Sequence, residues 1–300
     1  MWTLNEAEAQ PFQKLYDVAY SSLMKNVVYL ESGPYLCAGG HQYHSLWTRD
    51  FAFSSYGLME TGHPRIVQNH LKKLIQATRA KEAPAPPLIP RTLDSSPSLS
   101  RILRHTLGKG LFPLFGDEEM EDPLIPEFEG EHGTKTMDSN SLLIITACHY
   151  LQKTDSTPLN EKWEKDLFSL LNFYKKRFGQ KGLITQKKYA DWQDSCKRKG
   201  AVFYTNFLYW KALRSLIVTY PERAQKENLK SKSDELRQDI LTHFWRPRLT
   251  LFQTHESEEF FTLEDQLFVL LDPEFFLEEE KKKLYQSLKK HPLWNSFRIP

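Results

Sequence analysis

Cysteine is scarce in this sequence, and long apolar runs are missing. The three cysteines, Cys37, Cys148 and Cys196, lie far apart, which fits neither a disulfide framework nor the paired spacing of a structural zinc site. A reducing compartment such as the cytosol is the simplest interpretation. The apolar stretch at 142–147 is far too short to span a bilayer, and the first residues lack the order of a secretion signal. We therefore expect a soluble, cytoplasmic protein.

An excess of charge of one sign is also missing. The chain carries 40 basic and 38 acidic residues, a net charge of +2, so no strong field attracts nucleic acid or an anionic membrane. We interpret the basic run at 197–199 as solvated surface. A glycine-rich phosphate loop, a G-x-S-x-G turn and a histidine pair on one helix face are absent too. The sequence predicts no nucleic-acid or membrane partner, no cofactor and no metal.

Helical periodicity dominates what is there. In residues 7–28, apolar side chains recur at steps of three and four, as one buried stripe requires: Phe12, Leu15, Val18, Ala19 and Leu23. Alternation typical of strands is nearly absent, so we predict an all-α fold. The other predicted helices span 50–60, 64–79, 139–153, 160–178, 201–219, 226–245, 263–271 and 275–290.

The connections suggest how these nine helices are arranged. Residues 81–100 are rich in proline, and residues 116–133 are acidic and rich in turn formers. Together they predict a loop excursion over 81–137, with short helical turns near 99–107. No internal repeat of fixed period is visible. Alternating short and long loops favour a ring of antiparallel helix hairpins, formed by a single domain over residues 1–300.

Carboxylates and indoles gather just before three of the predicted helices. Each cluster combines an acid with an indole or another hydrogen-bonding side chain. In a ring of hairpins, the starts of alternate helices meet at one end, so we expect the three clusters to line one pocket. The clusters are Trp47, Arg49 and Asp50; Asp138, which precedes Ser139 and Asn140; and Asp191, Trp192 and Asp194.

Each cluster also has a local explanation. Arg49 and Asp50 can form a buried ion pair. Asp138 or Ser139 can cap the N-terminus of the following helix. The third cluster can lie on a solvated loop. These alternatives stay open for each cluster taken alone.

Taken together, the clusters fit glycoside hydrolysis. That reaction needs one protonated carboxylic acid, which gives a proton to the departing oxygen, and one carboxylate, which activates water or attacks the sugar. Trp47 and Trp192 can stack on a sugar ring, while Arg49, Asp50 and Asp191 can hold its hydroxyls. Two histidines, His41 and His44, precede the first cluster. They lack a third metal ligand at a clear spacing, but they can serve as acid and base in a sugar epimerase or isomerase.

Three segments resemble known enzymes. They are similar, in order, to the neutral and alkaline invertases and to glycogen-debranching (amylo-α-1,6-glucosidase-like) hydrolases, over about residues 36–220. The segments are LWTRDFAFSSYGLMETGHPRIVQNHL from residue 46, MDSNSLLIITACHYLQKTDS from residue 137 and YADWQDSCKRKGAVFYTNFLYWKAL from residue 189.

The resemblance implies an (α/α)6-barrel, a helical toroid, and an inverting glycoside hydrolase acting on an α-linked gluco-oligosaccharide or related glycoside. It implies that Asp138 is the general acid. It also implies that sugar is bound by Trp47, Arg49 and Asp50 and by the pocket-lining Asp191, Trp192 and Asp194.

The sequence departs from the family in two ways. Leu142 and Leu143 replace paired tryptophans of the invertases, which weakens a prediction of sucrose. Twelve helices are implied and nine are predicted, and the sequence ends at Pro300, before the late glutamate that the family uses as its second carboxylate. We therefore expect a toroid that is incomplete at its C-terminus, whose uncovered apolar faces favour a homo-oligomer. Glu264 and Asp265 are the nearest acidic substitutes. The alternative is a catalytically incomplete barrel that binds carbohydrate.

Overall fold

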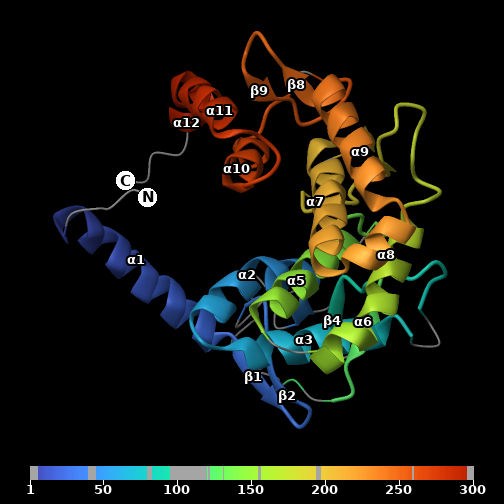
Figure 1. The fold of residues 1–300 in the computed structure, drawn as a ribbon. Coiled ribbons are helices and arrows are strands. Elements are labelled where there is room, and N and C mark those ends of the chain that lie inside the picture. The colour runs from blue at the N-terminus through green and yellow to red at the C-terminus, as the bar shows by residue number, and fades with distance from the viewer. Residues whose placement is uncertain are drawn as a thin grey trace. The chain divides into compact units, whose positions relative to one another are not determined.

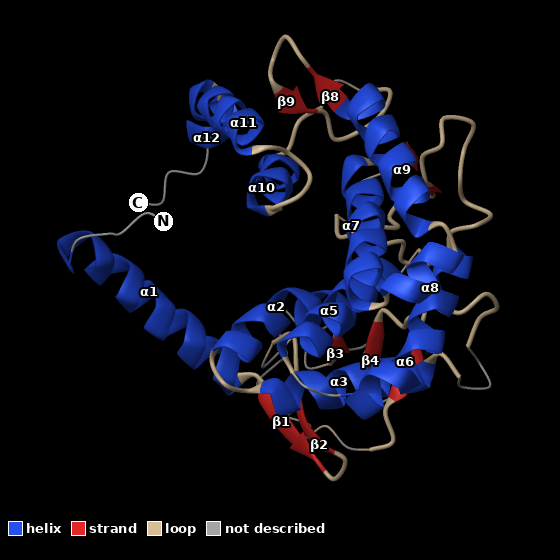
Figure 2. Cartoon of the chain, in the orientation of Figure 1, coloured by secondary structure: helices blue, strands red, loops and turns tan. Residues whose placement is uncertain are grey.

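The helices predicted from the sequence are present in the structure, a computed structural model that is described over 6–39, 45–79, 83–94, 120, 122–130, 132–154, 157–193, 197–258 and 260–295. Figures 1 and 2 show a mainly helical chain with short strands, so the all-α class is confirmed. The chain divides into two compact units, Met1–Glu129 with His149–Asp155, and Gly130–Cys148 with Ser156–Pro300. Each unit is described by itself, and the single domain over 1–300 stays a prediction.

The first unit combines helices with two small antiparallel sheets. Thr48 is the first residue of α2, and its hydroxyl donates to the carbonyl of Pro90 over 2.6 Å. This bond links the start of α2 to the segment just before β4. His70 is buried against the Phe51 ring, 3.8 Å between centroids, and burial lowers its pKa to about 3. The elements are α1 (Glu6–Lys25), β1 (Val27–Leu30), β2 (Gly33–Leu36), β3 (Leu46–Trp47), α2 (Thr48–Glu60), α3 (Pro64–Ala77), β4 (Thr92–Asp94) and β5 (Ile125–Glu127).

The first predicted helix differs from the structure in two respects. It was expected to run to residue 28, but α1 ends at Lys25, because Val27 and Val28 pair with Leu36 and Tyr35 in the β1–β2 hairpin. β-Branched residues suit such a pleated surface. The buried stripe is also wrong in part: Leu15 and Val18 are 62% and 61% exposed, since helical periodicity places them on one face without specifying what covers that face.

In the second unit the largely apolar helix α7 packs along α9. Its first eight residues, 203–210, are all buried, as expected for a helix whose apolar residues cover more than one face. Phe203 of α7 lies against Phe252, 4.9 Å between ring centroids. The elements are α5 (Ser139–Lys153, whose last turn belongs to the first unit), α6 (Thr157–Leu170), η2 (Leu171–Phe173), β6 (Thr185–Gln186), β7 (Gly200–Ala201), α7 (Phe203–Thr219), α8 (Pro221–Lys226), α9 (Leu229–Phe244), β8 (Trp245–Arg246), β9 (Leu251–Phe252), α10 (Leu263–Leu271), α11 (Glu278–Lys290) and α12 (Pro292–Asn295).

Each of the nine predicted helices has a counterpart in the structure. Some of their ends differ from the prediction, and specific contacts or backbone conformations lie at these ends. The helix expected over 160–178 stops being α-helical at Leu170, whose carbonyl accepts a hydrogen bond from Asn140 Nδ2 over 3.0 Å. The helix expected over 226–245 begins at Leu229, because Asn228 adopts a left-handed conformation with φ of 54°. The short helices α8 and α12 and the strands were not predicted.

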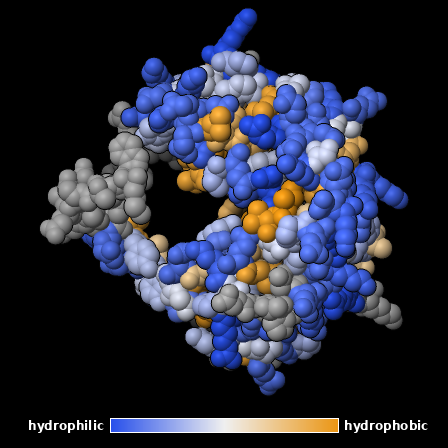
Figure 3. Space-filling view, in the orientation of Figure 1, coloured by the Kyte–Doolittle hydropathy of each residue, from blue (hydrophilic) through white to orange (hydrophobic). Residues whose placement is uncertain are grey.

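The surface and the loops add two observations. The face in Figure 3 is mostly hydrophilic, with several hydrophobic patches; within the described chain, no helix has the length and apolar character needed to cross a bilayer. The segment 81–137, expected to be a loop, contains the strands β4 and β5. The two strands pair with each other, with Thr92 opposite Glu127. The helical turns expected near 99–107 lie outside the described residues.

Candidate active site

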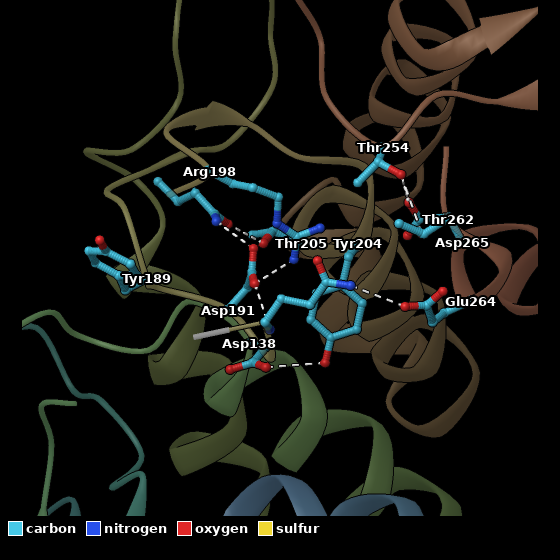
Figure 4. Close-up of polar contacts among 12 residues, drawn as sticks. Asp138, Tyr189, Asp191, Arg198, Tyr204, Thr205, Thr254, Thr262, Glu264 and Asp265 are labelled. Carbon is cyan, nitrogen blue, oxygen red and sulfur yellow. Dashed lines mark hydrogen bonds and ion pairs between the residues drawn. The ribbon is translucent and has the colours of Figure 1, made fainter. Parts of the chain in front are cut away.

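Asp138 lies at the start of α5 and is 1% exposed. Its carbonyl accepts the first helical hydrogen bond, from the Leu142 amide over 2.9 Å. Its side chain reaches another helix: Oδ2 accepts a hydrogen bond from the Tyr204 hydroxyl of α7 over 3.1 Å (Figure 4). Asp138 therefore does more than begin a helix, because its carboxyl group is held between α5 and α7 inside the second unit.

The backbone around Asp138 is fixed from both sides. The Met137 amide donates to the carbonyl of Ala190 over 2.7 Å, which links the second predicted cluster to the third. The buried Tyr174 hydroxyl donates to the Met137 carbonyl over 2.8 Å and lies 2.9 Å from the Ser141 hydroxyl. These contacts hold the carboxyl group in one place before any ligand arrives, as a catalytic group requires.

Asp191 is buried and multiply bonded, so the interpretation as a solvated loop is wrong for it. Oδ2 accepts from Gln186 Nε2 over 2.6 Å. Oδ1 accepts from the Gln193 amide over 2.9 Å and from Arg198 Nη2 over 2.5 Å. The Thr205 hydroxyl of α7 in turn donates to Gln186 Oε1 over 2.6 Å. A buried carboxylate with a buried guanidinium and an amide around it is compensated in charge and hydrogen bonding.

Arg198 contradicts the interpretation of residues 197–199 as solvated surface. Lys197 and Lys199 are exposed, but the Arg198 side chain is only 9% exposed and pairs with Asp191. A guanidinium can enter an interior when it meets a carboxylate there, and a basic run in the sequence does not reveal which member has such a partner.

Trp192 contacts the ring of Tyr204, the residue whose hydroxyl bonds Asp138. Trp192 is half-buried, and its ring lies 6.5 Å from that of Tyr204 at 63°. Tyr204 also contacts Phe268 of α10, with 5.5 Å between ring centroids. Asp194, which the sequence placed in the same cluster, lies outside the described residues.

The start of α10 brings two further acids to the second unit. Glu264 is half-buried, and its Oε1 accepts from Gln193 Nε2 over 3.1 Å (Figure 4). Asp265 is fully buried, and its Oδ2 accepts from the Thr254 hydroxyl over 2.6 Å; burial raises its pKa to about 6. Gln193 therefore joins Glu264 to the Asp191 and Trp192 segment, whereas Asp265 turns toward Thr254.

Trp47, Arg49 and Asp50 belong to the first unit. The Arg91 guanidinium lies 4.6 Å from the Trp47 ring, and Trp47 is half-buried. Arg49 is half-buried and Asp50 is exposed, in the first turn of α2. Although Asp50 reaches the surface, burial raises its pKa and the charge of Arg49 opposes that rise, so the alternative of an ion pair between the two stays a prediction. A pocket shared by all three clusters stays a prediction.

Some residues of the candidate site could be predicted from the sequence and others could not. Asp138, Asp191 and Trp192 are brought together through Tyr204 and the Met137–Ala190 hydrogen bond. Tyr204, Gln186 and Arg198 were missed; the only sequence signal for them is that they flank the third cluster. His41 and His44 lie outside the described residues. Elsewhere, in the described part, no three His, Cys, Asp or Glu side chains are grouped as metal ligands are.

The sequence matches no family model and no curated protein. Its structure is similar to a glycosidase variant in complex with glucose, at TM-score 0.63 and 9% identity, over 96% of this chain and 72% of that one. It is similar to a rhamnosidase from Klebsiella oxytoca with rhamnose bound, at TM-score 0.56 and 12% identity, over 83% of this chain. A glucoamylase from Saccharomycopsis fibuligera matches at TM-score 0.52 and 14% identity, over 85% of this chain and 54% of that one.

These neighbours are (α/α)6-barrel glycoside hydrolases, and the chain has their fold. It spans 42% of the Klebsiella rhamnosidase and 23% of a Bacillus rhamnosidase. At such low identity the likeness concerns the fold. The finer resemblance to invertases and debranching enzymes stays a prediction.

Proposed function

We propose that this protein, whose fold is that of the (α/α)6-barrel glycosidases, hydrolyses glycosides with Asp138 as its proton donor. One observation carries the proposal: the buried carboxyl group at the start of α5 is held by the Tyr204 hydroxyl beside the indole of Trp192. A carboxyl group next to an aromatic wall, in a site shielded from water, is suited to protonate a departing sugar oxygen.

The proposed reaction is a single displacement with inversion. Asp138 gives its proton to the glycosidic oxygen as the bond from that oxygen to the anomeric carbon breaks. A water molecule attacks the anomeric carbon and gives its proton to a second carboxylate, about 6.5–9.5 Å from the first in inverting enzymes. Of the two acids on α10, Glu264 suits this role better, because Asp265 is fully buried and bonded to Thr254.

We propose an α-linked gluco-oligosaccharide or related glycoside as the substrate. Support comes from the debranching-type segments of the sequence and from the glucose seen with one structural neighbour. Trp192 would stack on the sugar, and Asp191, through the side chains it holds in place, would order the pocket. Trp47 at the end of β3, Arg49 and Asp50 in α2, and Asp194 are proposed to bind the sugar as well. The three scattered cysteines support a cytoplasmic site of action.

The test is turnover of a panel of α- and β-glycosides, followed by the reducing sugar released. We expect hydrolysis by the wild-type chain and its loss in Asp138→Asn, with folding unchanged in circular dichroism. Asp234→Asn is the matched control, because Asp234 is an exposed carboxylate on α9. Near-normal activity of Asp138→Asn would eliminate the assignment.

The two alternatives give different results in the same experiment. A catalytically incomplete barrel would bind oligosaccharide in calorimetry and release no sugar from any glycoside. An epimerase or isomerase that uses His41 or His44 would introduce solvent deuterium into the recovered sugar and lose that exchange in the two His→Ala variants.

A further inference from the structure

Gln193 has an amide oxygen whose role in the fold is unassigned. Its Nε2 donates to Glu264 Oε1 over 3.1 Å. A carboxylate oxygen only accepts, so this contact determines which end of the amide faces Glu264. The Oε1 atom must therefore point elsewhere, and it is buried without a hydrogen-bond partner among the residues that the structure describes. A buried acceptor left in this state destabilises the chain.

Arg198 has a complementary feature, a buried N–H donor for which the described residues supply no acceptor. Its Nη2 donates to Asp191 Oδ1 over 2.5 Å, and the side chain is 9% exposed. Its Nε is buried, and within the described ranges no acceptor faces it. A guanidinium has five N–H donors and no acceptor, so this N–H can only donate.

Gln193 and Arg198 belong to one hydrogen-bonded cluster around Asp191. The backbone N–H of Gln193 and the Nη2 of Arg198 both donate to the same oxygen, Asp191 Oδ1. Both residues are therefore anchored at the carboxylate that precedes Trp192 in the sequence. A hydroxyl group can donate to an amide oxygen and can accept from an N–H group, so hydroxyls of a ligand are suited to both atoms. Buried polar groups that lack a partner until the substrate arrives are what allow a site to reject analogues without the matching hydroxyl.

We propose that Gln193 and Arg198 recognise a hydroxyl of the sugar, and that they make this site selective for neutral glycosides. The inference rests on the proposed function and assigns two residues that it leaves without a role. The expected neutrality follows from the charges of this cluster: the Arg198 guanidinium is paired with Asp191, and the Glu264 carboxylate accepts from the uncharged amide of Gln193 (Figure 4). A sugar that carries a carboxylate or a phosphate would bring a further negative charge to this cluster, which like charges oppose.

The experiment measures sugar binding to the whole chain by calorimetry and ligand-observed NMR. The probes are glucose, rhamnose, the monodeoxy analogues of glucose, and two anions, glucuronate and glucose 6-phosphate. Arg198→Lys keeps a charge for Asp191 but removes Nε. Gln193→Met keeps the approximate shape and removes both amide atoms. Arg237→Lys is the matched control, because Arg237 also donates through Nε and Nη2, to the Phe275 carbonyl.

We expect glucose or rhamnose to bind and both anions to bind at least about 10-fold more weakly. One monodeoxy analogue should bind about 10- to 100-fold more weakly than glucose to the wild-type chain. In Arg198→Lys and Gln193→Met that difference should shrink to about 2-fold, and in Arg237→Lys it should persist.

The inference is overturned if every deoxy analogue binds like glucose, if the discrimination persists in both variants, if an anion binds as tightly as glucose, or if neither neutral sugar binds. Should the variants fail to fold, the deoxy analogues on the wild-type chain decide alone. The test is separate from that of the proposed function: hydrolysis by Asp138→Asn would remove the assignment of the acid, whatever the sugar binding shows.

Discussion

The Tyr204 hydroxyl and the Asp138 carboxyl group, 66 positions apart in the sequence, form a buried hydrogen bond of 3.1 Å. Tyr204 lies in the first turn of α7, and its ring also contacts Trp192 and Phe268. One side chain therefore orients the proposed proton donor and contributes to the apolar wall beside it. Asp138 and Tyr204 are both buried, which favours a rigid arrangement.

Tyr204→Phe should slow turnover without unfolding the chain. The ring contacts remain, while the donor to Asp138 is lost, so the carboxyl group becomes less precisely oriented. We expect kcat to fall about 10-fold, since misplacing a catalytic group by a fraction of an ångström is costly. Tyr209→Phe, on the same helix and also buried, is the control and should keep its kcat. Equal rates for the wild-type chain and Tyr204→Phe would remove Tyr204 from the catalytic site.

Asp191→Asn should lower the free energy of unfolding strongly. The substitution leaves the buried Arg198 guanidinium without its carboxylate, and breaking such a pair costs about 3–5 kcal/mol. Lys181→Met removes an ion pair with Glu256 whose lysine is 51% exposed, and it should cost at most about 1 kcal/mol. Urea denaturation of both variants makes the comparison. A loss of similar size in the two would mean that Asp191 and Arg198 do not form a buried pair.

Asp265→Asn should change how stability depends on pH. Burial raises the pKa of Asp265 to about 6 in the folded chain, whereas the unfolded chain has the ordinary value of about 3.9. The folded state therefore binds the proton more tightly, and this contribution to stability is lost as pH rises from about 4 to about 6. Since one pKa unit corresponds to about 1.4 kcal/mol, the loss is on the order of 2–3 kcal/mol.

Thermal unfolding at several pH values measures this contribution. The wild-type chain should lose stability across that window beyond the change seen in Asp265→Asn, in which the group cannot titrate. Asp234→Asn, at an exposed carboxylate, should follow the wild-type curve. Parallel curves for the wild-type chain and Asp265→Asn would show that folding does not raise the pKa of Asp265.

The helices could be predicted because periodicity is a local property of the sequence. Nine apolar stripes gave nine helices, and errors arose where a contact distant in sequence decides an end, as when Asn140 bonds the carbonyl of Leu170. The β1–β2 hairpin was missed because the short Val27–Leu30 segment continues the apolar pattern of α1. Whether a stripe is buried depends on its neighbours, and for Leu15 and Val18 the sequence did not specify them.

The candidate site was predicted in part for the same reason. Asp138, Asp191 and Trp192 stand out because an acid or an indole just before a helix is a local pattern. Tyr204 occupies a position in an aromatic helix that looks like ordinary core, and only its contact with Asp138 gives it a role. Arg198 sits between two exposed lysines, so its burial follows from Asp191 rather than from its neighbours in the sequence.

The proton-donor role of Asp138 is tested most directly with two substrates that differ in their need for an acid. An α-glucosyl fluoride releases fluoride, which leaves with little help from a proton, whereas an unactivated α-glucoside needs the proton. If Asp138 is the general acid, Asp138→Asn should lose about 10²–10⁴-fold on the unactivated glucoside and less than about 10-fold on the fluoride. Equal losses on both substrates, or no loss on either, would contradict the account.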